Sequence, residues 1–275
     1  RQALANVLIS SKEALLEELA KGRTRMVLPN AAQISVGHMA HPLTEAVIKS
    51  MHLNRQVMLT GPTGAGKTYM IGSIAASMAV PFYKYSCSRD SSVHDLLGYK
   101  QPASETYLNT TFLKAYEGGG IFLVDEYDAM SGDMALFFNG VTDSSDFISV
   151  PHRDDNPIAK KHKDFYIVMC GNTWGNGSIE YSGRDFQDKA LLDRFRLCRF
   201  YIDYNTKLEK TLVSNHQMVF KLRKGLEQVS SYLSTRNIED IGKMMTNGDR
   251  FPDIVDMIIS DLTTGEQKKV KQSLT

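Results

Sequence analysis

Short apolar runs recur up to about residue 204 and alternate with segments whose apolar residues keep helical spacing. The runs favour buried strands because they are rich in β-branched and aromatic residues and are bounded by polar or glycine-containing segments. Strands that alternate with helices are typical of an α/β fold with a parallel sheet. The five predicted strands are Val57–Leu59, Phe82–Ser86, Ile121–Val124, Phe165–Cys170 and Cys198–Ile202.

Helical spacing also predicts the segments that connect these strands. The N-terminal segment Ala3–Ala20 is amphipathic, and we expect it to dock on the main domain or on a neighbouring subunit rather than to act as a signal peptide. Gly98–Thr106 is predicted to be a loop, and Phe147–Lys163 a hairpin with a charged tip. The other predicted helices are Pro42–Met51, Thr68–Met78, Ser91–Leu97, Thr111–Glu117, Ala129–Gly140 and Asp188–Arg196.

From about Asn205 onward the strand pattern stops, and one helical pattern follows another. This change predicts a small all-helical second domain. We therefore predict an N-terminal helix and linker (1–29), an α/β domain (30–204) and a helical domain (205–275), the last with a frayed tail at Glu266–Thr275. The predicted helices of the second domain are Thr206–Phe220, Gly225–Tyr232, Thr235–Met245 and Phe251–Ser260.

Composition places the chain among ordinary globular proteins, with 42% hydrophobic and 23% charged residues over a length of 275. The net charge of +1 favours neither nucleic acid nor a membrane surface, and no apolar run has the length of a transmembrane helix. The chain begins at Arg1 rather than at Met, which fits a fragment of a longer protein.

The three cysteines and two neighbouring histidines offer no metal site. Cys87, Cys170 and Cys198 are far apart in apolar surroundings, so we predict buried free thiols and a reducing, cytoplasmic location. His38 and His41 are three positions apart, but no cysteine or carboxylate cluster accompanies them.

A glycine-rich loop follows the first predicted strand and matches the pattern G-x-x-x-x-G-K-[ST] at each defined position. Such a loop turns its backbone N–H groups inward to bind phosphate, and the positive end of the next helix adds to the attraction. Lys67 can reach the β- and γ-phosphates, and the Thr68 hydroxyl can bind Mg²⁺. The predicted nucleotide-binding residues here are Gly61, Pro62, Thr63, Gly64, Ala65, Gly66, Lys67, Thr68 and Tyr69.

A second motif, IFLVDEYD at Ile121–Asp128, runs from a buried strand directly into carboxylates. Ligands of open parallel sheets bind at the carboxyl ends of the strands, so these groups should lie beside the phosphate loop. Asp125 is predicted to hold Mg²⁺ and Glu126 to orient and polarise the attacking water.

Three further polar residues are candidates for phosphate chemistry. Asn172 follows the strand Phe165–Cys170 and could hold the water or sense the γ-phosphate, although a turn-forming asparagine remains the alternative. Arg194 ends a helix and could reach a neighbouring subunit's γ-phosphate, as could Arg196. Arg236 lies in the first turn of a helix, where its charge opposes the dipole unless an anion compensates; an ordinary surface arginine is the alternative.

Taken together, these segments resemble AAA+ ATPases, specifically the MoxR-type and cobalt-chelatase small-subunit-like branch among the dynein-related domains. The resemblance covers about Ile34–Met245, and five motifs in the right order are far more specific than one. The segments that carry it are GPTGAGKT at Gly61–Thr68, GGIFLVDEYD at Gly119–Asp128, GNT at Gly171–Thr173, LLDRF at Leu191–Phe195 and STR at Ser234–Arg236.

The resemblance implies a P-loop ATPase with a helical lid, ATP and Mg²⁺ as cofactors, and a homo-oligomeric, usually hexameric, ring that remodels an unknown protein or macromolecular client. It implies that Gly98–Tyr107 and Phe147–Lys163 face the ring pore or its axial surface, and it leaves Gly175–Gly183 without a role. Phages and plasmids also encode ATPases of this branch, so a chelatase role does not follow. The implied roles are Walker A for Lys67 and Thr68, Walker B for Asp125 and Glu126, sensor 1 for Asn172, trans arginine finger for Arg194, sensor 2 for Arg236, and adenine contact for Val36 and Gly37.

Three other functions stay open. The basic residues Arg153, Lys160, Lys161 and Lys163 are compatible with a nucleic-acid motor or loader, or with a solvated loop. A nucleotide switch or scaffold with little hydrolysis is disfavoured by Glu126 and the arginines. A small-molecule kinase would fit the lid, but no acceptor pocket is indicated. Neither the client nor the choice between ATP and GTP can be deduced from the sequence.

Overall fold

The computed structural model describes the backbone of residues 23–27 and 33–37, and backbone and side chains of 40–101, 106–153, 156–177, 181 and 183–274. The predicted helix Ala3–Ala20 and His38 lie outside these residues. The chain divides into two compact units: one comprises Lys67–Ile202 and the residues up to Gly61, the other Asp203–Thr275 and Pro62–Gly66. No described helix has both the length and the apolar character needed to cross a bilayer.

The first unit is built on a five-stranded parallel sheet in the order β11-β3-β10-β7-β4. The predicted parallel α/β fold is confirmed, with each strand within two residues of its predicted bounds. The strands are β3 (Gln56–Thr60), β4 (Phe82–Ser86), β7 (Gly120–Asp125), β10 (Phe165–Gly171) and β11 (Arg199–Tyr201).

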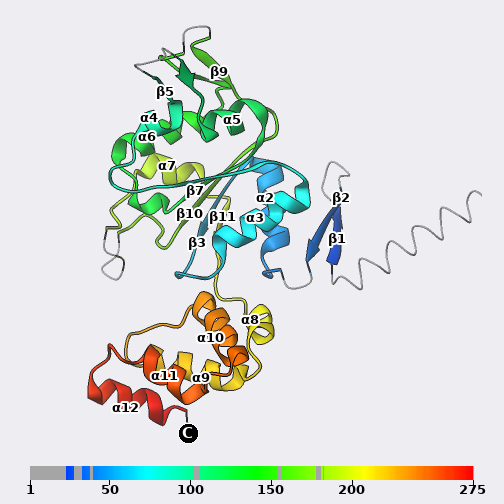
Figure 1. Cartoon of the computed structure of the whole chain (residues 1–275). Helices are drawn as coiled ribbons and strands as arrows, with labels where there is room; N and C mark the ends of the chain where they lie inside the picture. The colour runs from blue at the N-terminus through cyan, green and yellow to red at the C-terminus, as the bar shows by residue number, and fades with distance from the viewer. Residues whose placement is uncertain are drawn as a thin grey trace, which may run out of the picture. The chain divides into compact units, whose positions relative to one another are not determined.

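Helices flank this sheet on both sides, with α2 and α3 on one side and α5, α6 and α7 on the other (Figure 1). The predicted helices are confirmed, and their ends shift by at most three residues. Their bounds are α2 (Thr44–Asn54), α3 (Lys67–Met78), α4 (Val93–Leu97), α5 (Thr111–Gly118), α6 (Gly132–Val141) and α7 (Lys189–Arg194), and a 3₁₀ turn, η1 (Tyr127–Ala129), follows β7.

Among the described residues, three antiparallel strand pairs stand outside the main sheet. The predicted hairpin is confirmed as β8 (Phe147–Ser149) and β9 (Ile158–Lys160), in which Phe147 pairs with Lys160. The predicted loop Gly98–Thr106 instead begins with β5 (Tyr99–Lys100), which pairs with β6 (Tyr107–Leu108). A pair that the sequence analysis missed, β1 (Arg23–Val27) with β2 (Gln33–Gly37), precedes α2.

The position of β10 and β7 inside the sheet explains why both strands are nearly continuous apolar runs. All seven residues of β10 are buried, as are the first five of β7, because both strands lie inside the sheet and helices cover both faces. Phe112 of α5 packs against this centre, with its ring edge-on to those of Phe122 and Phe165. The edge strand β4 alternates between exposed and half-buried residues instead.

The second unit contains five helices in its described residues, around a separate apolar core. The predicted helix Thr206–Phe220 is wrong as one element, because Val213 adopts an extended conformation after α8 and a new helix starts at His216. The predicted helix Gly225–Tyr232 is also wrong: Gly225 lies inside that helix, which ends at Glu227. The helices are α8 (Thr206–Leu212), α9 (His216–Glu227), α10 (Thr235–Asn247), α11 (Phe251–Ile258) and α12 (Thr264–Gln272).

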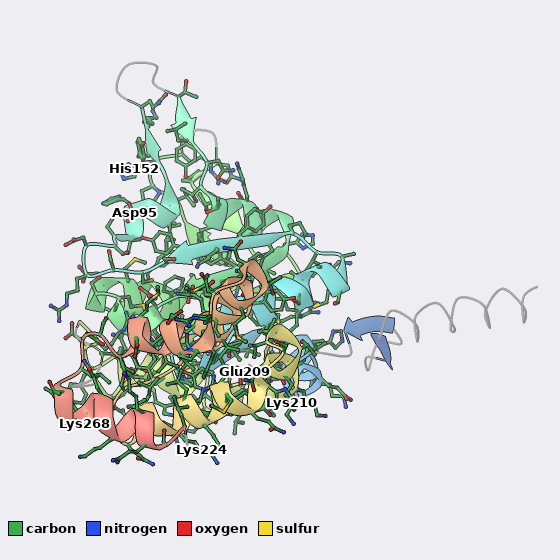
Figure 2. The ribbon with its side chains drawn as sticks, turned by 60° about the horizontal axis from the view of Figure 1, so that its bottom comes forward. Asp95, His152, Glu209, Lys210, Lys224 and Lys268 are labelled. Atoms are coloured by element: carbon green, nitrogen blue, oxygen red, sulfur yellow. The ribbon has the colours of Figure 1, made fainter. Side chains whose placement is uncertain are left out.

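The tail predicted to fray is helix α12. Thr263 and Glu266 form a reciprocal capping box at its start, which satisfies backbone N–H groups of the first turn. Val270 is fully buried, and α12 packs on α9 at Gly225, where a Cβ would lie 2.2 Å from the Ser273 Oγ. Lys224 of α9 and Lys268 of α12 extend away from the helices (Figure 2). The charged residues of this tail therefore lie on one face of a helix that docks on α9.

A buried ion pair joins three helices of this unit. Glu209 of α8 is fully buried and accepts two hydrogen bonds from Arg223 of α9, at 2.7 and 2.9 Å, and one from the Thr235 hydroxyl of α10 at 2.5 Å. The Arg223 guanidinium also donates to the Leu233 carbonyl and stacks over the Tyr204 ring at 4.2 Å. Nearly every polar atom of the pair is thus satisfied, which is what makes its burial tolerable.

We predict that Glu209→Ala lowers the free energy of unfolding of the helical unit by about 3–5 kcal/mol, because it strands the buried Arg223 charge. Urea unfolding of the full chain, followed by circular dichroism, measures the change. The neighbouring Lys210→Ala removes an exposed charge from the same helix and should alter stability by less than about 0.5 kcal/mol. Equal effects of the two substitutions would contradict this account.

Candidate active site

The order of the strands brings three chain segments to one edge of the sheet. β10 lies between β3 and β7, with Gly171 opposite Thr60 and Cys170 opposite Asp125. All three strands are parallel, so the residues that follow them emerge side by side. The first loop glycine, Gly61, lies close to β11, where a Cβ would be 1.9 Å from the Ile202 carbonyl oxygen.

Lys67 is buried at this edge and is held by groups from two strands. Its ammonium donates to the Gly61 carbonyl at 2.7 Å and to the Asn172 side-chain oxygen at 3.0 Å. Burial lowers the pKa of Lys67 below its ordinary value, partly offset by the nearby Asp125 and Asp128 carboxylates. A buried ammonium of this kind is predisposed to bind an anion, because an anion would restore the stability of its charged form.

Thr68 and Asp125 face each other across the site. The Thr68 hydroxyl donates to Asp125 Oδ2 at 3.0 Å, and Lys84 of β4 forms an ion pair with the same oxygen at 2.8 Å. Sequence reasoning missed Lys84, because its position in an edge strand looked like ordinary alternation. No cluster of three or more His, Cys, Asp or Glu suited to a metal occurs among the described residues. One carboxylate and one hydroxyl fit Mg²⁺, which keeps several waters and takes phosphate oxygens.

Glu126 follows Asp125 in a left-handed backbone conformation, with φ +59°. This region is unfavourable for a residue with a side chain, and it turns the Glu126 carboxylate away from the strand direction. Just over half of the side chain, 53%, is exposed, and its Oε1 lies 3.4 Å from the guanidinium of Arg184. The residue is therefore accessible to water and near a cation that the sequence analysis did not single out.

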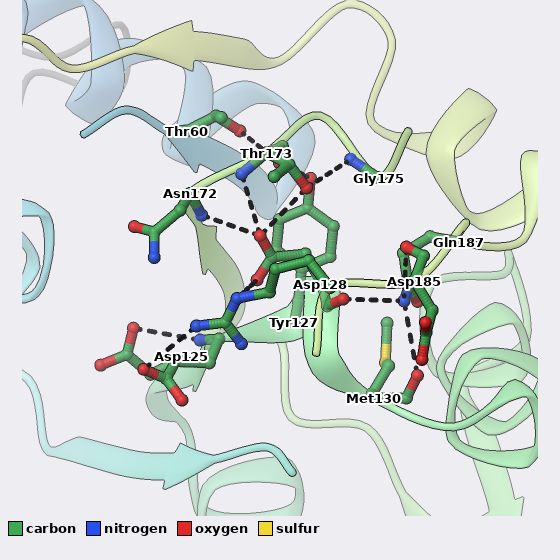
Figure 3. A network of polar contacts seen from close by, with 12 residues as sticks. Thr60, Asp125, Tyr127, Asp128, Met130, Asn172, Thr173, Gly175, Asp185 and Gln187 are labelled. Atoms are coloured by element: carbon green, nitrogen blue, oxygen red, sulfur yellow. Dashed lines mark hydrogen bonds and ion pairs between the residues drawn. The ribbon is translucent and has the colours of Figure 1, made fainter. Parts of the chain in front are cut away.

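Asp128 is fully buried and organises the turn that carries Asn172 (Figure 3). Its Oδ2 accepts hydrogen bonds from the backbone N–H of Asn172 at 3.0 Å, and from the backbone N–H and hydroxyl of Thr173 at 2.9 and 3.0 Å. Gly171 permits this approach, because a Cβ there would lie 3.1 Å from the Asp128 Cγ. The third acid of the motif thus has a structural task that its place after a strand did not reveal.

The two candidate finger arginines differ in their surroundings. Phe195 between them is fully buried. Arg194 is one-third exposed; it donates to the Asn139 side-chain oxygen at 3.3 Å and lies 3.6 Å from Asp143. Arg196 is 74% exposed and pairs with Asp193 one turn away. Neither arginine contacts the cluster around Lys67, so the role of either toward a neighbouring subunit stays a prediction.

The remaining predicted residues lie elsewhere. Val36 and Gly37 end β2, a strand that contacts α3, and only their backbone is described. Tyr69 is 74% exposed on α3. Gly64 and Gly66 have positive φ, as the loop requires. Arg236 lies in the first turn of α10 in the second unit, so its role toward phosphate stays a prediction.

The three cysteines are free and buried, as predicted. Burial raises the pKa of the Cys87 thiol to about 12, and the Asp125 carboxylate acts in the same direction. Cys170 is fully buried with a raised pKa for the same reason. Thiols held protonated in this way are poor nucleophiles.

We predict that Asp128→Ala destabilises the first unit by about 3–5 kcal/mol, because three donors and the Arg184 guanidinium lose a buried acceptor. Chemical unfolding of the full chain measures this loss. The exposed Asp90→Asn is the control and should change stability by less than about 0.5 kcal/mol. An Asp128→Ala protein as stable as this control would show that the network does not support the turn.

Comparison with curated proteins finds remote bacterial relatives. An uncharacterized protein of Staphylococcus saprophyticus is 26% identical over 161 residues, which are 56% of this chain and 58% of that protein. An uncharacterized protein of Staphylococcus aureus is 24% identical over 203 residues, 71% of this chain and 72% of the relative. The chain thus spans less than two thirds of the length of the first of these relatives.

Comparison with solved structures and family models agrees with the fold. The crystal structure of NtrX from Brucella abortus superposes with a TM-score of 0.54 at 14% identity, covering 99% of this chain and 66% of that one, a likeness that supports the fold alone. The model of the AAA domain (dynein-related subfamily) matches residues 56–195, just over half of the chain. This match includes Lys67, Asp125 and Asn172, which the sheet brings together. The chain therefore belongs to the dynein-related subfamily of AAA domains.

Proposed function

We propose that this AAA domain is a Mg²⁺-dependent ATP hydrolase that works in the cytoplasm as a homo-oligomeric ring, usually of six subunits, and remodels a protein or macromolecular client. Within the family we assign it to the MoxR-type, cobalt-chelatase small-subunit-like branch. The observation that carries the proposal is that four predicted residues meet at one edge of the sheet. Lys67 donates to Asn172 at 3.0 Å, and Thr68 donates to Asp125 at 3.0 Å.

The residues of this edge suit the two parts of a metal–nucleotide complex. Lys67 would bind the β- and γ-phosphates in place of its present partners, the Gly61 carbonyl and Asn172. Thr68 and Asp125 would hold Mg²⁺, while Lys84 would give up the Asp125 oxygen that it now neutralises. Bound Mg²⁺ would neutralise charge on the phosphate oxygens during transfer.

The groups beside this pair suit hydrolysis. Glu126 has an accessible carboxylate that would accept a proton from the attacking water. Asn172 is held through its backbone by Asp128, and its side chain would contact the γ-phosphate. For residues 205–275 we propose the role of a lid, in which Arg236 would bind the nucleotide's phosphates.

A nucleic-acid motor is the weaker candidate, because half of the basic residues at the β8–β9 hairpin already bind groups of this chain. Arg153 forms two hydrogen bonds of 2.8 Å with Glu117. Lys161 donates to the Asp143 carbonyl, and its pKa is lowered by burial. Two lysines, 160 and 163, remain exposed, which is little for a phosphate backbone that needs several contacts.

We predict that Glu126→Gln lowers kcat for ATP hydrolysis by about 10²–10⁴-fold and leaves ATP affinity within about threefold of wild type, because it removes a general base without touching the phosphate cradle. Phosphate release measures turnover, and equilibrium binding of a fluorescent ATP analogue measures affinity. The control Glu239→Gln, at an exposed ion pair of α10, should leave both unchanged. Full turnover in Glu126→Gln would remove this residue from the mechanism.

The same variant tests the client. A protein that binds ATP without hydrolysing it should retain whatever it acts on, so affinity-tagged Glu126→Gln with ATP should enrich partners that are absent with ADP. Stimulation of wild-type turnover by DNA, falling steeply with salt, would favour the motor instead.

We predict that Arg194→Ala lowers turnover by about 10³-fold or more while ATP binding persists, because a finger arginine stabilises charge that develops in the transition state. Arg196→Ala, two residues further along the chain, is the matched control, and we expect an effect of less than about fivefold. The reverse order would assign the finger to Arg196. Turnover by a demonstrated monomer would contradict any finger supplied in trans.

Mixing variants separates action in trans from action in cis. Glu126→Gln subunits keep the arginine, and Arg194→Ala subunits keep the base. If the finger crosses the interface, a mixture of the two inactive proteins regains part of the turnover. If Arg194 acts within its own subunit, the mixture stays inactive.

A further inference from the structure

Arg184 lies between two carboxylates of the candidate active site. It follows Gly175–Gly183, a segment to which the family resemblance gives no role. Its guanidinium is 3.4 Å from Glu126 Oε1 through Nη2, and 3.5 Å from Asp128 Oδ1 through Nε, and the side chain is 12% exposed. One arginine thus contacts both the proposed base and the acid that fixes the Asn172 turn.

The contact with Asp128 anchors the arginine. Arg184 Nε and Asp128 Oδ1 are both buried, and neither has a hydrogen-bond partner in the part of the chain that the structure describes. Buried groups of this kind each cost about 1–3 kcal/mol unless they are satisfied. At 3.5 Å they are just beyond hydrogen-bond distance and oppositely charged, so each is the best available partner for the other.

The chain around Arg184 is clamped independently of that contact. Asp185 accepts two hydrogen bonds from Arg89, at 3.0 and 3.2 Å, in the loop that follows β4. The backbone N–H of Asp185 and the side chain of Gln187 both donate to the Asp128 carbonyl (Figure 3). Gln187 is buried, so the backbone of this segment is fixed on η1, the turn that follows β7.

The Glu126 carboxylate has fewer contacts to hold it than the neighbouring Asp125 carboxylate. Asp125 is held by Thr68 and Lys84, whereas half of the Glu126 side chain faces solvent on a left-handed backbone. Arg184 approaches Oε1, and no described residue occupies Oε2. The guanidinium therefore lies beside one carboxylate oxygen and leaves the other to accept a proton.

We propose that Arg184 is a positioning residue: it orients the Glu126 carboxylate and, through Asp128, ties that orientation to the turn that carries Asn172. This inference rests on the proposed function, in which Glu126 is the base. It gives the segment after β10 a task within its own subunit, distinct from that of the arginine offered to a neighbour. A movement of the Asn172 turn would be passed to Glu126 through a single guanidinium.

Steady-state kinetics of Arg184→Ala tests the proposal. A misdirected base slows the chemical step, so we expect kcat to fall about 10- to 100-fold while KM for ATP stays within about twofold. Arg184→Lys should recover part of kcat, because an ammonium can pair with one carboxylate but cannot span two. Arg250→Gln removes an exposed arginine of the second unit and should leave both parameters unchanged.

The double variant shows whether Arg184 acts through Glu126. In the Glu126→Gln background, Arg184→Ala should lower the residual turnover by less than about twofold, since the carboxylate to be positioned is gone. Three results would each overturn the proposal. The first is an equal fall in turnover in both backgrounds, and the second is an unchanged or raised kcat in Arg184→Ala. The third is a rise in KM without any change in kcat. Full turnover in Glu126→Gln alone would instead refute the proposed function.

A spectroscopic measurement reads the contact without turnover. In arginine-labelled protein, the guanidinium signal of Arg184 is identified by its loss in Arg184→Lys. We expect that signal to shift in Glu126→Gln and in Asp128→Asn and to stay in place in Glu239→Gln. A signal that stays in place in both Glu126→Gln and Asp128→Asn would show that Arg184 contacts neither carboxylate. The inference would then fail regardless of the kinetic results.

Discussion

The position of β10 between β3 and β7 is the constraint on which the site depends. Each of these strands is followed by one functional segment, and the register places Gly171 beside Thr60 and Cys170 beside Asp125. A shift of β10 by one residue would turn all of its side chains to the other face and separate Asn172 from Lys67. Its seven buried residues hold that register, so packing in the core determines geometry at the edge.

The Asp128 side chain holds the turn that follows β10 in place. A carboxylate without solvent is stable only with several donors, and the Asn172–Thr173 turn provides three of them. Burial therefore has two consequences: the turn cannot move without stranding a charge, and any group that contacts Asp128 is coupled to the turn. Gly171 is essential to both, because a side chain there would keep the carboxylate away from the turn.

The sequence alone predicted the elements that show a hydrophobic period or a fixed motif spacing. Apolar runs located the five strands of the main sheet, and the spacing of Gly61, Gly66, Lys67 and Thr68 located the loop. It failed where long-range contacts decide. The charged tail folds as α12 because Val270 finds a site on α9, and Glu209 and Arg223 pair although neither looks apolar. Arg184 and Asp128 are fifty-six positions apart, and no local pattern announces such a contact.

The charges of the first unit's site balance among the chain's own residues. Each carboxylate there has a cation near it, so a polyphosphate entering alone would meet little uncompensated positive charge beyond Lys67. In the proposed function, Asp125 would help to hold a metal ion that arrives with the polyphosphate and would release Lys84, while Arg184 would stay with its buried partner because leaving would cost the full burial penalty of both groups. The same arrangement would thus favour the metal complex over the bare anion and would keep the Glu126 carboxylate directed. The pairs are Lys84 with Asp125, Arg184 with Glu126, and Arg184 with Asp128.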